Sequence, residues 1–231
     1  MTVVLARRAV AELIGTAFLV MAVVGSGIAA TRLSPDDVGL QLLENSLVTG
    51  AVLVALILAL QPVSASFNPV VTVIERALGV IDGRTTTALV AAQVVGGVVG
   101  VVIANLMFDL DAVALSTHDR TGGDLWLAEV VATFGLVLVV FGCLRTGRAD
   151  TVALAVGGYI TAAYWFTSST SFANPAVTVA RTLSDTFAGI QPSAAPAFVA
   201  CQLVGGALGL VAVRFLFPTP VAVAADQEPA R

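Results

Sequence analysis

The chain has 231 residues, of which 58% are hydrophobic and 11% are charged, and its net charge is −4 at pH 7. A soluble globular domain is about a quarter charged, so this balance favours lipid as the solvent and argues against an ordinary soluble domain. Every basic residue is an arginine, and these arginines form no basic stripe, which argues against a nucleic-acid partner.

The first apolar segment follows Arg7 and Arg8, an arrangement that is also typical of a secretion signal. Because this segment is long, carries Glu12 and is followed by further apolar runs, we expect it to remain as a first membrane helix. A membrane-crossing helix takes about 20 mostly apolar residues. Six segments meet or approach this length, and the fifth is the shortest: 9–30, 40–60, 86–108, 125–144, 151–166 and 195–217.

Two further apolar stretches, which end near residues 78 and 183, are too short to cross the membrane. Each opens with an Asn-Pro pair, Asn68-Pro69 and Asn174-Pro175, after a run rich in small residues. Proline suits the first position of a helix because its missing N–H would have had no partner there, and the preceding asparagine can cap the helix. The pattern predicts two short helices that enter the membrane from opposite sides and end inside it.

The two halves of the chain repeat three motifs in the same order. Each half has a glutamate in its first span, then an Asn-Pro-x-Val-Thr-Val sequence, then a glutamine followed by glycines. Since each half holds three spans, the second half crosses the membrane in the opposite sense, which makes an inverted repeat. We therefore predict an all-α membrane protein with six transmembrane helices and two re-entrant half-helices. It forms one integral channel domain over 1–231, with repeats at about 7–108 and 125–217.

The arginines also predict the orientation in the membrane. An N-terminus on the inside places eight arginines on the cytoplasmic side and three, Arg32, Arg120 and Arg181, on the other. This split follows the positive-inside rule. Both ends are then cytoplasmic, including a tail at 218–231, in a multi-pass protein of the cell membrane.

The half-helices imply a pore. Irregular backbone at membrane depth is tolerated only where it is buried in protein or lines a wet cavity. Each helix start carries about half an elementary positive charge, so two starts that face one point disfavour a cation there. The side chains of Asn68 and Asn174 add N–H donors, which water or a neutral hydroxylated solute can accept.

Glu12 and Glu129 lie inside apolar spans, where an ionisable side chain is costly and is by default a functional candidate. A proton relay is one interpretation. Their equivalent places in the two halves favour a structural one, in which each carboxylate accepts hydrogen bonds from the irregular loop before the Asn-Pro pair. We expect Gln93 and Gln202 to satisfy backbone groups in the same way.

Together these motifs resemble the aquaporin, or major intrinsic protein, family over about residues 7–217. The most specific elements are the paired Asn-Pro motifs and the glutamates of the first and fourth spans. The resemblance implies a homotetramer with one pore in each subunit and passive flux of small neutral solutes. Selectivity in such pores depends on diameter, lining groups and electrostatic barriers.

Two positions depart from the family pattern. Members usually carry Asn-Pro-Ala twice; here the first motif is Asn68-Pro69-Val70, whose extra methyl groups can narrow or reshape the midpoint, and the second ends in the usual Ala176. Members that select water or glycerol usually carry arginine at the next position, where this chain has Val177. The absence of this arginine predicts a wider and more apolar outer constriction. Valine in place of arginine resembles the pattern of bacterial aquaglyceroporin-like channels that conduct arsenite.

The other predicted constriction residues are Thr49 in the second span, Ser171 before the second Asn-Pro pair and Tyr164 in the fifth span, with Ala162 as the competitor for Tyr164. Arg181 lies one helical turn beyond the position of the missing arginine. It either places a charge in the outer vestibule or simply ends the half-helix beside water, and the sequence leaves both open.

The resulting prediction is a passive channel for water, glycerol and neutral metalloid hydroxides such as arsenite. An ion-coupled secondary transporter is the alternative, because transporters also use inverted repeats and broken helices. An intramembrane enzyme is disfavoured by the absence of HExxH and GxSxG motifs and by a single histidine, His118, in an outer loop. Cys143 and Cys201 form no metal-binding spacing, so we expect neither a metal nor a cofactor.

Overall fold

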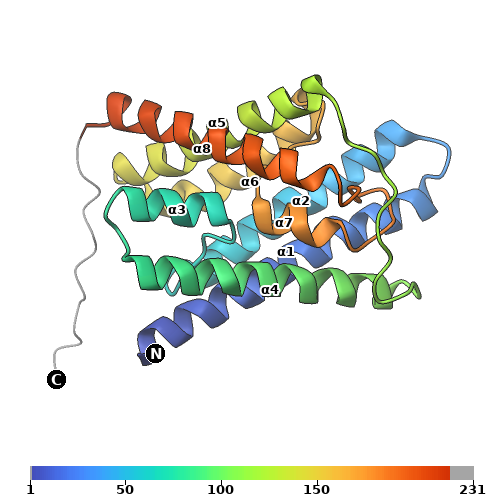
Figure 1. The fold of residues 1–231 in the computed structure, drawn as a ribbon, viewed down its shortest axis with the longest axis horizontal. Coiled ribbons are helices and arrows are strands. Elements are labelled where there is room, and N and C mark those ends of the chain that lie inside the picture. Colours follow the sequence, from blue (N-terminus) through green and yellow to red (C-terminus); the bar gives the residue numbers. More distant parts are fainter. Residues whose placement is uncertain (1, 219–231) are drawn as a thin grey trace.

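The computed structural model describes residues 2–218, and within this range all regular structure is helical (Figure 1). Most of the predicted tail, residues 219–231, lies outside the described residues. In chain order the helices are α1 (Val3–Leu33), α2 (Val38–Leu60), α3 (Pro69–Ala77), α4 (Gly83–Met107), α5 (Gly123–Arg145), the 3₁₀ turn η1 (Ala149–Thr151), α6 (Val152–Phe166), α7 (Pro175–Arg181) and α8 (Ala195–Leu216).

Five of these helices, α1, α2, α4, α5 and α8, are long and apolar enough to cross a membrane. The fifth predicted span is α6, which has only 15 residues and packs between α2 and α5. Helix α1 starts well before the predicted residue 9, because Thr2 accepts a hydrogen bond from the N–H of Leu5 and caps it. Arg7 and Arg8 therefore lie within the helix, where arginine is well tolerated.

The repeat predicted from the sequence is visible in the packing. Helix α1 packs along α4 in the first half, and α5 packs along α8 in the second. The half-helices α3 and α7 lie between the layers formed by α4 and α8, and each contacts both of them (Figure 1). The last span of each half, α4 or α8, thus packs against the half-helices of both halves.

Glycines allow the paired spans to approach backbone to backbone. The Cα atoms of Gly96 and Gly100 face the carbonyl groups of Leu13 and Ala17, with no room for a Cβ at either glycine. A Cβ at Gly209, the equivalent position in the second half, would lie 3.2 Å from the carbonyl oxygen of Phe134. Such close approach is the usual role of small residues in membrane helix pairs.

A Gly100→Ala substitution should therefore lower the melting temperature in detergent. Its Cβ would meet the backbone of Ala17, which cannot rotate away, and overpacking of this kind typically costs about 1–3 kcal/mol. Gly158→Ala is the matched control, because a Cβ there meets no atom within 4 Å. Equal melting temperatures for the two variants would contradict the packing described for α1 and α4.

Candidate functional site

The site is built where the two half-helices begin. Asn68 caps α3, and its Oδ1 accepts a hydrogen bond of 2.9 Å from the N–H of Val70. Asn174 caps α7 in the same way, with Oδ1 accepting from the N–H groups of Ala176 at 3.0 Å and Val177 at 3.3 Å. In both cases proline occupies the first turn, so the helix starts lie where the Asn-Pro pairs predict them.

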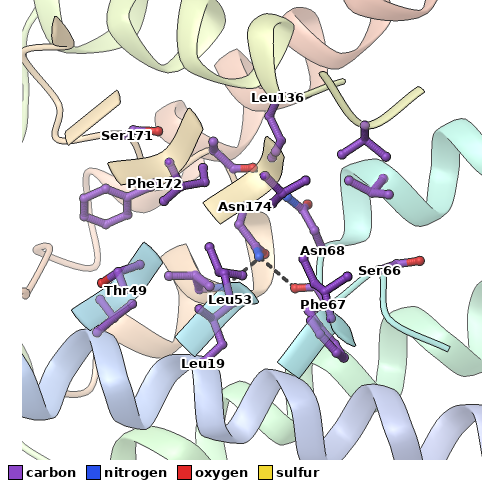
Figure 2. Close-up of a pocket in the computed structure, with 18 of the residues that line it drawn as sticks. Leu19, Thr49, Leu53, Ser66, Phe67, Asn68, Leu136, Ser171, Phe172 and Asn174 are labelled. Carbon is purple, nitrogen blue, oxygen red and sulfur yellow. Dashed lines mark hydrogen bonds between the residues drawn. The ribbon is translucent and has the colours of Figure 1, made fainter. Parts of the chain in front are cut away.

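The two asparagines also connect the halves (Figure 2). The Nδ2 of Asn68 donates to the carbonyl of Ala173 at 2.7 Å, and the Nδ2 of Asn174 donates to the carbonyl of Phe67 at 2.8 Å. Each side-chain amide carries two N–H groups, so one remains after this bond. Both asparagines line a common cavity, into which the remaining donor can be presented.

The loop before α3 is held by one carboxylate. Glu12 is fully buried, and its two oxygens accept from the hydroxyl of Ser64 at 2.6 Å and from the N–H groups of Ser66 at 2.9 Å and Phe67 at 2.7 Å. The Nε2 of Gln93 donates to the same carboxylate at 2.8 Å. Four donors thus converge on one buried group, which fixes the loop that presents Asn68.

The second half repeats this arrangement around Glu129, which is also fully buried. Its oxygens accept from the hydroxyl of Ser169 at 2.6 Å and from the N–H groups of Phe172 and Ala173, both at 2.9 Å. The Nε2 of Gln202 donates to it at 2.6 Å. Neither Glu129 nor its counterpart is among the described residues that line the cavity, so the geometry favours loop support over a proton relay.

These loops need support because their backbone is strained. The residues just before the two asparagines, Phe67 and Ala173, both have φ of 47°, and Ser171 has φ of 53°. Non-glycine residues in the left-handed region each cost about 1–3 kcal/mol and persist only when neighbouring groups hold them. The carboxylate clamps supply that restraint.

The cavity brings together the four residues predicted for the outer constriction, Thr49, Tyr164, Ser171 and Val177. The Thr49 hydroxyl and the Tyr164 phenol are hydrogen-bonded at 3.1 Å, which ties α2 to α6 on one wall. Ala162, the competing candidate in the fifth span, is exposed on the outside of the bundle instead. The remaining wall is largely apolar and includes Leu19, Val23, Leu53, Ile57, Val71, Leu136, Val140, Val152, Val156 and Ile160.

Val70 lies away from this cavity, although its extra methyl groups suggested a changed midpoint. It is buried at 2% exposure, and its Cγ1 occupies the space beside Gly206 of α8. The next residue, Val71, faces the cavity. The valine at this position is thus accommodated by a glycine on a neighbouring helix.

The contact between Val70 and Gly206 predicts that substitutions at these two positions compensate for each other. Gly206→Ala alone should lower the melting temperature, because its Cβ would collide with the Cγ1 of Val70. Val70→Ala alone should cost about 1–3 kcal/mol through the cavity it leaves. The double variant should be more stable than the sum of the single effects predicts, as measured by thermal unfolding in detergent. Strict additivity would show that the two side chains do not share this space.

Two arginines lie beside Phe172, which lines the cavity, and only one of them, Arg181, was a candidate in the sequence. The guanidinium of Arg181 lies 3.3 Å from the centroid of the Phe172 ring, and that of Arg120 lies 5.0 Å from it. Arg120 comes from the long loop between α4 and α5. Its Nε donates to the carbonyl of Gly189 at 2.8 Å and its Nη2 to that of Phe187 at 3.3 Å. No sequence motif marks this loop contact.

The pKa values of two residues in the loop between α4 and α5, Arg120 and His118, are both lowered. Burial lowers the pKa of Arg120 to about 10, so it remains positively charged at pH 7. Burial also lowers the pKa of His118, and the charges of Arg120 and Arg181 lower it further, so this histidine is neutral at pH 7. The positive charge of this loop at pH 7 is therefore carried by Arg120 and not by His118.

Comparison with known proteins agrees with this architecture. The family model described as "Major intrinsic protein" matches residues 1–151. The chain is 49% identical to the aquaglyceroporin AqpS of Rhizobium meliloti (strain 1021) over 213 residues, which cover 92% of this chain and 91% of that protein. It is 30% identical to aquaporin AqpM of Methanothermobacter thermautotrophicus over 244 residues, which cover 92% of this chain and 98% of that protein.

A solved structure, the aquaglyceroporin from Plasmodium falciparum, has the same fold, with a TM-score of 0.65 and 17% sequence identity over 94% of this chain and 97% of that one. The inverted repeat, the helix arrangement and the matches along the sequence lead to one conclusion. The chain belongs to the major intrinsic protein family of membrane channels.

Proposed function

We propose that this protein is a passive channel for water, glycerol and other small neutral solutes, and that solutes pass between the ends of α3 and α7. The observation that carries this proposal is the reciprocal pair of hydrogen bonds between Asn68 and Ala173 and between Asn174 and Phe67. This arrangement leaves N–H donors of the two asparagine side chains, together with two positive helix ends, at one point of an otherwise largely apolar cavity. Neutral hydroxylated molecules suit such a passage, and hydrated cations do not.

The proposed solutes include neutral arsenite. Val177 lines the cavity in place of the arginine that water- and glycerol-selective members usually carry. Trivalent arsenic hydroxide is uncharged near pH 7 and presents hydroxyl groups much as a small polyol does. The similarity to a protein named as an aquaglyceroporin supports glycerol as a further candidate.

The chain is proposed to act as one domain with one pore, in a homotetramer of the cell membrane with both termini in the cytoplasm. Large apolar side chains are exposed along the outer faces of several helices, which fits contact with lipid and with neighbouring subunits. The arginine distribution supports the orientation.

A permeability panel tests the proposal. Proteoliposomes that contain the protein should pass water, glycerol and arsenite faster than empty liposomes in stopped-flow and uptake measurements. The rates should not change when a proton or sodium gradient is imposed, because a channel needs no coupling ion. Flux that requires either gradient would favour the ion-coupled transporter, and flux no faster than in empty liposomes would reject the channel.

A further inference from the structure

Arg181 is the last residue of α7, one turn beyond Val177. Its side chain is only 2% exposed to the outside of the molecule. It lines the same cavity as Thr49, Tyr164 and Val177. This burial rules out the interpretation in which Arg181 only ends the half-helix beside bulk water.

The guanidinium of Arg181 is held in place by two contacts. Its Nε donates to the carbonyl of Ala188, and its Cζ lies over the ring of Phe172, which in turn packs edge-on against Phe198. The two Nη groups have no hydrogen-bond acceptor within the described part of the chain. Since a guanidinium has five N–H donors, those of the Nη groups remain for a molecule in the cavity.

Arg120 places a second positive charge behind the same ring. Its guanidinium lies 5.0 Å from the ring centroid of Phe172, and all its hydrogen bonds go to backbone carbonyls of Ser169, Phe187 and Gly189. Arg120 does not line the cavity, and these three bonds hold it to the loops, so it acts on the cavity through its charge and by positioning those loops. No carboxylate accepts a hydrogen bond from either guanidinium in the described residues.

We propose that Arg181 is the specificity-determining residue at the outer mouth, where its guanidinium supplies, one helical turn further out, the hydrogen-bond donors and positive charge that residue 177 lacks. Small neutral solutes with two or more oxygen acceptors bind to its free N–H groups, while cations are repelled by Arg181 and Arg120 together. Val177 leaves room beneath the guanidinium, so a polyol or metalloid hydroxide is selected by donors at the mouth and not by a narrow ring. This inference rests on the proposed channel function.

The test compares Arg181→Leu with Arg32→Leu in proteoliposomes. Arg32 is a matched control, because it also lies over a phenylalanine ring, that of Phe108, but is exposed and away from the cavity. Arg181→Leu should raise the leak of sodium or guanidinium ions by about tenfold or more and change the ratio of glycerol to water permeability. Arg32→Leu should change neither quantity.

Two further variants keep the test decisive if Arg181→Leu does not fold. Arg181→Lys should retain cation exclusion but alter the glycerol-to-water ratio, because lysine keeps the charge and loses the planar donors. The exchange Val177→Arg with Arg181→Val should exclude cations while restricting glycerol more than water. Wild-type values for both the ratio and the leak in Arg181→Lys or Arg181→Leu would overturn the inference. Absence of flux in the wild type would reject the channel itself, which is a separate outcome.

Discussion

Glu129→Leu should abolish solute flux and prevent recovery of a folded, monodisperse protein. The substitution leaves the N–H groups of Phe172 and Ala173, the hydroxyl of Ser169 and the amide of Gln202 without their acceptor. A buried donor without a partner costs about 1–3 kcal/mol, so four of them would consume most of the stability of a typical domain. The strained loop before Asn174 would then lose the restraint that positions it.

Glu129→Gln is the graded control for this experiment. Its side chain has the same shape and keeps one acceptor oxygen, but its new N–H₂ group faces donors, so we expect an intermediate loss of thermal stability. Asp124→Asn, at the first turn of α5, should have little effect because Asp124 is exposed. Measurements are gel filtration, thermal unfolding and glycerol flux. A well-folded Glu129→Leu protein whose flux differs only in its dependence on a proton gradient would support the relay interpretation instead.

Val177→Arg should reduce glycerol and arsenite permeability by about tenfold or more while it reduces water permeability less. The new side chain would enter the cavity beside Thr49 and Tyr164, at a position that is 4% exposed. It would also bring a like charge four residues from Arg181 on the same helical face, which is unfavourable.

The control for this substitution is Val177→Leu, which adds bulk without charge or donors. If the loss of glycerol flux comes from the guanidinium, the leucine variant should stay much closer to the wild type in stopped-flow measurements. Equal solute ratios in the arginine variant and the wild type would remove Val177 from the selective part of the pore.

Much of this fold could be predicted because its determinants are local. Apolar runs predict spans, and an Asn-Pro pair predicts a helix start whatever surrounds it, so α3 and α7 begin at the predicted proline. The ends of α1 were predicted less well, because a membrane helix continues beyond the hydrocarbon region and apolarity no longer marks where it stops. The helix runs from Val3 to Leu33.

The site was harder to predict where it depends on contacts between distant segments. Val70 is a departure from the family motif, but whether it faces the pore depends on Gly206, which is far along the chain. Arg120 lies in a loop without a motif, and its place beside Phe172 depends on carbonyl acceptors of Ser169, Phe187 and Gly189. The position of Arg181 depends on how Phe172 and Ala188 fold back on it.

The central claim is that solutes pass through the cavity between the half-helix ends, and a pair of adjacent cysteine variants tests it most directly. Cys143 and Cys201 are first replaced by alanine, and Val71→Cys and Val70→Cys are made separately in that background. Val71 faces the cavity, whereas Val70 faces Gly206.

The measurement is glycerol permeability before and after treatment with methyl methanethiosulfonate, a small neutral thiol reagent. The structure predicts strong inhibition of Val71→Cys and little change in Val70→Cys. Undiminished flux through a fully labelled Val71→Cys protein would show that solutes do not pass between α3 and α7.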